Sequence, residues 1–200
     1  MRQSGKNQKR TIAVLLTGLF MVQQTMGLSV FAASTISGVT NGGSGTFNID
    51  PTTKTNGTGF RHYQDFNLGQ GDVANLNFAD INTFVNMVDN QVVINGIVNS
   101  VRGNGFYNGK AVFISPNGMV VGASGVLNVG SLGVYAPNSI DYTNLKNSPS
   151  AATLAEATEN ASNGGAPITI NGKVITAGNV DLVGGQIDIA KNAGIVGGVN

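Results

Sequence analysis

The side chains that could carry acid, base or metal chemistry are few in this chain. It has 200 residues, one histidine (His62), no cysteine and ten acidic residues. A single histidine without cysteine partners is insufficient for the multi-histidine and thiolate sites that bind zinc. His62 also has no serine or carboxylate partner at a spacing typical of nucleophilic catalysis, so we interpret it as a residue on a strand surface.

The acidic residues show no arrangement typical of catalysis. Polysaccharide-cleaving enzymes built on β-helices need clustered carboxylates for acid–base chemistry or calcium binding. Asp181 and Asp188 are the one pair that we expect on a shared strand face, and we interpret the other acidic residues as solvated surface groups. We therefore predict no enzyme activity and no cofactor, and a polysaccharide-acting β-helix enzyme is the alternative function.

The N-terminal segment has the layout of a secretory signal peptide. Four of the eleven basic residues lie in the first ten positions, and the mostly apolar run 12–22 follows them. Val30-Phe31-Ala32 then supplies a cleavage sequence, with cleavage predicted after Ala32 and Ala33 as the near alternative. A membrane anchor would need about 20 uninterrupted apolar residues. We predict that residues 1–32 direct export through the Sec machinery.

The remainder of the chain does not have the charge of a nucleic-acid-binding protein. After position 32 the chain holds seven basic and ten acidic residues, a formal net charge of −3. Binding to phosphates requires clustered lysine and arginine side chains, and the part of the sequence after position 32 has no such cluster. We therefore expect no nucleic-acid partner.

The composition after position 32 favours β structure. It includes 19 Val and 13 Ile against 7 Leu, and β-branched side chains suit a pleated strand better than a helix. The whole chain contains 25 Asn, a residue that tolerates turns and whose amide can bond to an identical neighbour. The sequence predicts short strands that turn at Asn and Gly.

A weak internal repeat indicates how these strands are organised. The pattern Asn-Gly-x-Val begins at Asn95, Asn117 and Asn171, with separations of 22 and 54 residues. Residues 138–165 contain a run of helix-forming residues, and leaving out these 28 residues reduces the second separation to 26. We predict an all-β solenoid, a parallel β-helix, with a short helical excursion near 148–160. A sandwich with Asn-Gly hairpins is the alternative fold.

We divide the exported part of the chain into two regions. Residues 33–89 differ in pattern from residues 90–200 and are predicted to cap the first coil, because an uncapped coil exposes unpaired backbone groups. Residues 90–200 are predicted to form the coils. The last residues keep the same coil-like composition, so we expect the sequence to be the front piece of a longer protein.

Four segments together resemble the N-terminal secretion domain of the filamentous haemagglutinin family: Tyr63 to Phe78, Val92 to Val98, Gly109 to Gly122 and Val126 to Leu132. The resemblance implies a right-handed parallel β-helix that is exported to the periplasm. It also implies recognition by the periplasmic domains of a dedicated outer-membrane β-barrel transporter, and a final location outside the cell or on its surface. Members of this family act mainly as adhesins, and some act as cytolysins or contact-dependent toxins.

One motif of the family has a counterpart in this sequence. Where the family has Asn-Pro-Asn-Gly-Ile, this chain has Ser115-Pro116-Asn117-Gly118-Met119. The pair Asn95-Gly96 is our second candidate segment. From the residues alone, proline followed by Asn-Gly predicts a turn that shapes a coil corner. Contact with the transporter is the alternative role of both segments.

The expected function is therefore that of a secretion domain in a surface adhesin. A host receptor or surface glycan would be bound by regions downstream of residue 200. A purely structural repeat protein of the cell surface is the third interpretation.

Overall fold

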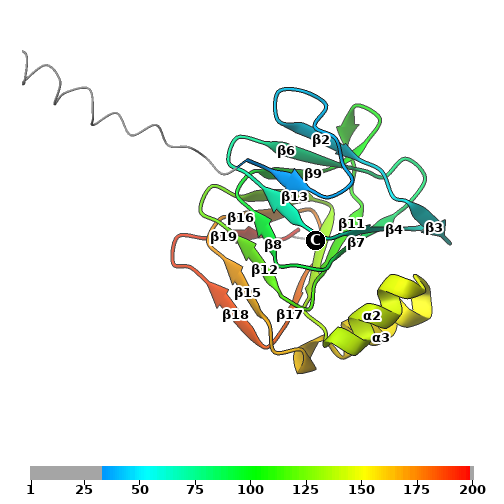
Figure 1. Cartoon of the computed structure of the whole chain (residues 1–200). Helices are drawn as coiled ribbons and strands as arrows, with labels where there is room; N and C mark the ends of the chain where they lie inside the picture. The colour runs from blue at the N-terminus through cyan, green and yellow to red at the C-terminus, as the bar shows by residue number, and fades with distance from the viewer. Residues whose placement is uncertain (1–32, 199–200) are drawn as a thin grey trace, which may run out of the picture. The chain divides into compact units, whose positions relative to one another are not determined.

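A computed structural model describes residues 33–198, which belong to one compact unit dominated by short strands (Figure 1). The strands form three sheets, which we name A, B and C. Sheet A contains β1 (Thr35–Ile36), β5 (Phe66–Leu68), β8 (Val92–Ile94), β12 (Met119–Val121), β15 (Pro167–Ile170) and β18 (Gln186–Ile189). Sheet B contains β2 (Thr46–Ile49), β6 (Val73–Asn77), β9 (Ile97–Arg102), β13 (Val126–Val129), β16 (Lys173–Thr176) and β19 (Gly194–Val196), with β10 (Gly105–Phe106) beside β9. Sheet C contains β3 (Thr53–Thr55), β4 (Thr58–Tyr63), β7 (Thr83–Val88), β11 (Lys110–Ile114), β14 (Ser131–Tyr135) and β17 (Val180–Val183).

Strands follow one another through the sheets in a fixed rotation. From β4 onward the chain passes from sheet C to A to B and back to C, with β10 outside the rotation. Within residues 33–198, β1, β3 and β10 pair in antiparallel fashion and the other neighbours are parallel. The prediction of a β-rich chain with parallel strands is confirmed. A sandwich of hairpins would require mainly antiparallel neighbours, which these sheets lack.

The alternation of side chains explains why these sequences form strands. In β16, Lys173 and Ile175 are exposed while Val174 and Thr176 are buried, the period of two expected for a strand with one solvated face. Strand β7 departs from this period because both of its faces are covered. Its inward side chains enter the core, and its outward ones lie beneath two helices.

The inward side chains of the three sheets form one apolar core. Phe66 makes edge-to-face contacts with Tyr63 and Phe113, at ring-centroid distances of 5.3 and 5.4 Å. One amide is enclosed among these rings: the Tyr63 hydroxyl donates to Asn86 Oδ1 at 2.9 Å, and Asn86 Nδ2 donates to the Val112 carbonyl at 3.1 Å. These bonds satisfy the buried amide, which would otherwise oppose folding.

Two helices pack on the outer face of sheet C (Figure 1). They are α2 (Ser139–Asn147) and α3 (Ala151–Glu159), followed by the 3-10 turn η1 (Ala161–Asn163). Asn138 caps α2 by accepting bonds from two backbone amides, and Ser150 caps α3 in a reciprocal pair with Thr153. The helical excursion predicted near 148–160 is confirmed. The sequence reasoning missed α2, whose Tyr142 and Leu145 are buried against the sheet.

The repeat predicted from the Asn-Gly-x-Val pattern was wrong, because its three copies do not occupy equivalent positions in the sheets. Val98 and Val174 do occupy one column of sheet B, each paired with Leu127. The segment at Asn117 instead leads into β12 of sheet A, so the separation of 22 residues is not the length of a coil. The Asn-Gly-x-Val pattern matches Asn95 with Asn117, although the strands that follow these residues, β9 and β12, belong to sheets B and A.

A ladder of asparagines on the outer face of sheet B shows how many residues separate neighbouring strands of this sheet. Asn75 donates to Asn48, Asn99 to Asn75 and Asn128 to Asn99, at 3.1, 3.2 and 3.2 Å. Successive members are 27, 24 and 29 residues apart. The predicted bonding between identical asparagine neighbours is confirmed at these four positions, and their spacing is the length of one passage through the three sheets.

The region 33–89, which the sequence predicts as a cap, contains both antiparallel and parallel strands. Its antiparallel members are β1 and β3, whereas β2, β4, β5, β6 and β7 already pair in parallel with the strands that come after them. The predicted signal peptide, residues 1–32 with Ala32, lies outside the described residues. Ala33, the alternative cleavage position, is exposed. None of the helices in residues 33–198 has the length and apolarity needed to cross a membrane.

Candidate functional site

Several side-chain hydrogen bonds of the described residues gather where the chain leaves sheet C for sheet A. We name this place the C–A corner and define it by the turns 64–65, 89–91 and 115–118. Because the strands on either side are parallel and in register, the three turns lie next to one another. The predicted motif Ser115 to Met119 lies at this corner.

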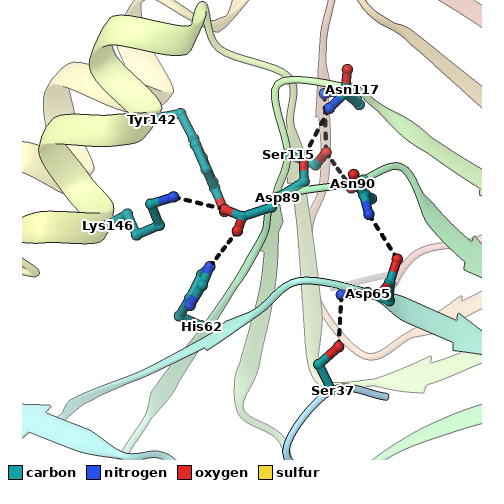
Figure 2. Close-up of polar contacts among 9 residues, drawn as sticks. All are labelled: Ser37, His62, Asp65, Asp89, Asn90, Ser115, Asn117, Tyr142 and Lys146. Carbon is teal, nitrogen blue, oxygen red and sulfur yellow. Dashed lines mark hydrogen bonds and ion pairs between the residues drawn. The ribbon is translucent and has the colours of Figure 1, made fainter. Parts of the chain in front are cut away.

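Hydrogen bonds of Ser115 and Asn117 connect the turn 115–118 to the turn 89–91 (Figure 2). The Ser115 hydroxyl donates to the Asn90 carbonyl at 2.8 Å and accepts from the Asn117 backbone amide at 3.0 Å. Asn117 Nδ2 donates to the Asp89 carbonyl at 2.8 Å. Ser115 is 2% exposed, so its hydroxyl is committed to the corner.

The rest of this motif is held by backbone geometry and packing. Gly118 has φ +74° and lies so close to the start of β15 that a Cβ atom would be 2.0 Å from the Pro167 carbonyl oxygen. A side chain is therefore excluded there on both counts. Pro116 is half-buried in the turn, and Met119 is buried as the first residue of β12. Among the five motif residues, Asn117 is exposed.

The second candidate segment lies elsewhere. Asn95 and Gly96 form the turn from sheet A to sheet B, between β8 and β9, so the structure does not bring them together with Ser115 and Asn117. A Cβ atom at Gly96 would be 2.3 Å from the Asp72 carbonyl oxygen, because this turn lies directly against the turn between β5 and β6. Asn95 is half-buried, and its carbonyl accepts the Ser124 hydroxyl at 2.8 Å.

The strongest electrostatic cluster at the C–A corner surrounds Asp89 (Figure 2). Its carboxylate accepts from Tyr142 at 2.9 Å and from Lys146 at 3.0 Å, both on α2. His62 Nε2, on β4, lies 2.9 Å from the other carboxylate oxygen. One side chain thus connects sheet C to the helical excursion.

The surroundings of Asp89 favour its ionised form. Partial burial of the carboxyl group acts to raise its pKa, but hydrogen bonds from Lys146, His62 and Tyr142 outweigh this effect, and the pKa is lowered. Burial is the main cause that raises the pKa of Tyr142, and its bond to Asp89 adds to the increase. The phenol therefore remains a donor and Asp89 an acceptor over the ordinary pH range.

Sequence reasoning missed this cluster. The interpretation of His62 as a strand-surface residue is confirmed, since His62 is exposed on β4, but its contact with Asp89 was not predicted. His62 pairs in register with Met87, two positions before Asp89, so the parallel pairing of β4 with β7 brings the two side chains together. The Asp89 carboxylate faces three donors and no described nucleophile, and its evident action is to fasten α2 to the sheet.

The expected pair of acidic residues does not form. Asp181 is on β17 of sheet C and Asp188 on β18 of sheet A, so the prediction of a shared strand face was wrong. In the part of the chain that the structure describes, no three histidine, cysteine or acidic residues gather as a metal-binding group.

Comparison with protein-family models, with curated proteins and with solved structures found no match.

Proposed function

We propose that the chain is the secretion domain of a filamentous haemagglutinin-like exoprotein. In this proposal a signal peptide delivers it to the periplasm through the Sec machinery. The periplasmic domains of an outer-membrane β-barrel transporter then recognise it, and it reaches the cell surface or the medium. The exoprotein acts as an adhesin through regions beyond residue 200.

The observation that carries the proposal is the rotation of strands through sheets C, A and B. We infer that each rotation is one coil of a right-handed parallel β-helix, the fold implied by the sequence resemblance. The aligned turns, the asparagine ladder and the enclosed apolar core are consistent with stacked coils.

The two ends of the strand stack differ in a way that suits this role. At one end, antiparallel β1 and β3 border sheets A and C. At the other, β17, β18 and β19 are the edge strands of the three sheets, and exposed Ile187, Ile189, Ile195 and Val196 accompany them. Parallel strand edges with apolar side chains favour the addition of another coil.

These properties support a route across the outer membrane. An extended chain in the periplasm offers strand edges that transporter domains can pair with. Coils that form outside the cell bury apolar surface, and this free-energy gain draws the remaining chain outward. The absence of cysteine means that no disulfide locks a folded form before passage.

Export with and without the transporter tests the proposal. We expect the protein in the medium when its cognate barrel is co-expressed, and retention in the periplasm when the barrel is absent. Deletion of residues 63–134 should abolish export. Equal export without the barrel, or equal export after the deletion, would contradict the proposal.

A pair of asparagine variants separates recognition from folding at the C–A corner. Asn117→Ala changes an exposed side chain of the family-like motif, and Asn128→Ala changes the last member of the ladder on sheet B. Recognition through the corner predicts that Asn117→Ala lowers export more than Asn128→Ala at equal thermal stability. A decrease in export that follows stability alone assigns Asn117 to the turn.

A further inference from the structure

A groove of about 320 Å³ lies between the outer face of sheet C and helix α3. This volume is at the lower end of the range for ligand sites, about 300–1,000 Å³. Thr58, Thr83 and Lys110 line it from the sheet, and Leu154 and Thr158 line it from the helix. The groove is separate from the C–A corner.

The sheet side of the groove is a polar stripe that crosses three strands. Thr58, Thr83 and Lys110 stand opposite one another on β4, β7 and β11, on strands about 4.8 Å apart. Among the described residues, no side-chain hydrogen bond engages the hydroxyls of Thr58 and Thr83. Each hydroxyl therefore has a donor and acceptor capacity open to the groove.

The charge at the end of the stripe is balanced. Lys110 Nζ lies 3.1 Å from Asp181 Oδ2, with side-chain exposures of 38% and 41%. The Tyr135 hydroxyl approaches the same carboxylate at 3.5 Å, and burial is the main cause that raises the pKa of this phenol. Within residues 33–198, Lys110 is the only charged residue that lines the groove, and Asp181 neutralises it. The site therefore favours an uncharged ligand over an anion.

The helix side combines small and apolar residues. Ala151 and Ala155 leave space beside the sheet, and Leu154 and Val112 present apolar surface. The ring of Tyr135 lies back over Gly133, where a Cβ atom would be 2.6 Å from a ring carbon. The absence of a side chain at Gly133 thus sets the position of an aromatic ring at the groove.

We propose that this groove binds a neutral oligosaccharide laid across β4, β7 and β11. A sugar chain offers hydroxyls that both donate and accept at successive positions, as the polar stripe requires, and its rings have apolar faces that suit Leu154 and the Tyr135 ring. Among the described residues no carboxylate lines the groove, and Asp181 beside it is paired with Lys110, so we propose binding of the saccharide rather than its cleavage.

Calorimetric titration of the purified protein, whether or not it is exported, with neutral tetrasaccharides tests the inference. The probes are maltotetraose, cellotetraose and tetra-N-acetylchitotetraose, with tetragalacturonate as the acidic comparison. We expect saturable binding of at least one neutral probe at concentrations up to about 10 mM. Amide NMR shifts should concentrate at Thr58, Thr83 and Lys110.

Two matched threonine variants define the site. Thr83→Val keeps the β-branched shape and removes one hydroxyl from the stripe, and we expect binding to weaken about tenfold. Thr169→Val makes the same change on β15 of sheet A, away from the groove, and should leave binding unchanged. Gly133→Ala displaces the Tyr135 ring and should also weaken binding.

Three results would overturn the inference. These are the absence of saturable binding by every neutral probe, binding of tetragalacturonate alone, and equal affinity of Thr83→Val and the unsubstituted protein. Because export is measured separately, failure here leaves the proposed secretion function standing, and failure of export leaves this site standing.

Discussion

Replacement of Asp89 should destabilise the protein by detaching α2 from sheet C. The Asp89 carboxylate accepts one bond from the buried Tyr142 hydroxyl, forms a partly exposed ion pair with Lys146, and accepts a partly exposed hydrogen bond from His62. The Tyr142 hydrogen bond contributes about 1 kcal/mol and each of the two partly exposed contacts about 0.5 kcal/mol. We therefore expect Asp89→Ala to lower the free energy of unfolding by about 2 kcal/mol.

The isosteric variant Asp89→Asn separates the contribution of the Tyr142 hydrogen bond from that of the negative charge. Asp89→Asn keeps an acceptor for Tyr142 but removes the negative charge that faces Lys146 and His62, so we expect a decrease of about 1 kcal/mol. Chemical denaturation of the exported protein measures both values. For a chain of this size, about 1 kcal/mol corresponds to a shift of about 2–4 °C in Tm. Asp188→Asn, at an exposed carboxylate on β18, is the control, with a change within about 0.5 kcal/mol.

The pH dependence supplies the sharper check. The pKa of Asp89 is lower in the folded protein than its ordinary value of about 3.9. Its stabilising contribution is therefore complete above about pH 4 and is lost as the pH falls through the lower folded value. The difference in unfolding free energy between the unsubstituted protein and Asp89→Asn should disappear in acid. A difference that stays constant from pH 6 to the acid range would refute the assignment.

Three further substitutions test the coil stack, each by its effect on unfolding free energy. Gly96→Ala should cost about 1–3 kcal/mol because its Cβ atom would meet a backbone carbonyl at 2.3 Å, whereas Gly105→Ala, with open space around it, should change little. Asn99→Leu breaks two ladder bonds and should cost about 1–2 kcal/mol, more than Asn128→Leu, which breaks one. Tyr63→Phe leaves a buried amide oxygen without its donor and should cost about 1–3 kcal/mol; an unchanged Tm would contradict that bond.

The accuracy of the sequence reasoning varied with the range of the interactions involved. The strand-rich character and the helix near 148–160 were predicted because β-branched side chains, turn residues and caps act within a few positions. Helix α2 was missed because its sequence has modest helix propensity. The burial of Tyr142 and Leu145 against sheet C supplies the missing stabilisation.

The candidate site likewise contains a local feature that was predicted and a long-range contact that was not. Ser115 to Gly118 was predicted as a turn, and the structure has a turn there. The contact between His62 and Asp89 was not predicted, because the assumed coil register came from matching Asn95 with Asn117, which lead into different sheets. A shift in register changes every long-range neighbour, so this one wrong match prevented prediction of the whole cluster around Asp89.

The sequence by itself determined the kind of local structure: short strands, Asn-Gly turns and a capped helix. It also determined that the chain has no cysteine and no cluster of basic residues after position 32. Only the tertiary structure determined which side chains contact one another. It stacked four asparagines at unequal spacings, gave Asp89 its three donors, and placed Thr58, Thr83 and Lys110 along one groove. Such neighbours are set by the pairing of strands about 20–30 residues apart, and the free energy of that pairing depends on the whole packed core rather than on any single segment.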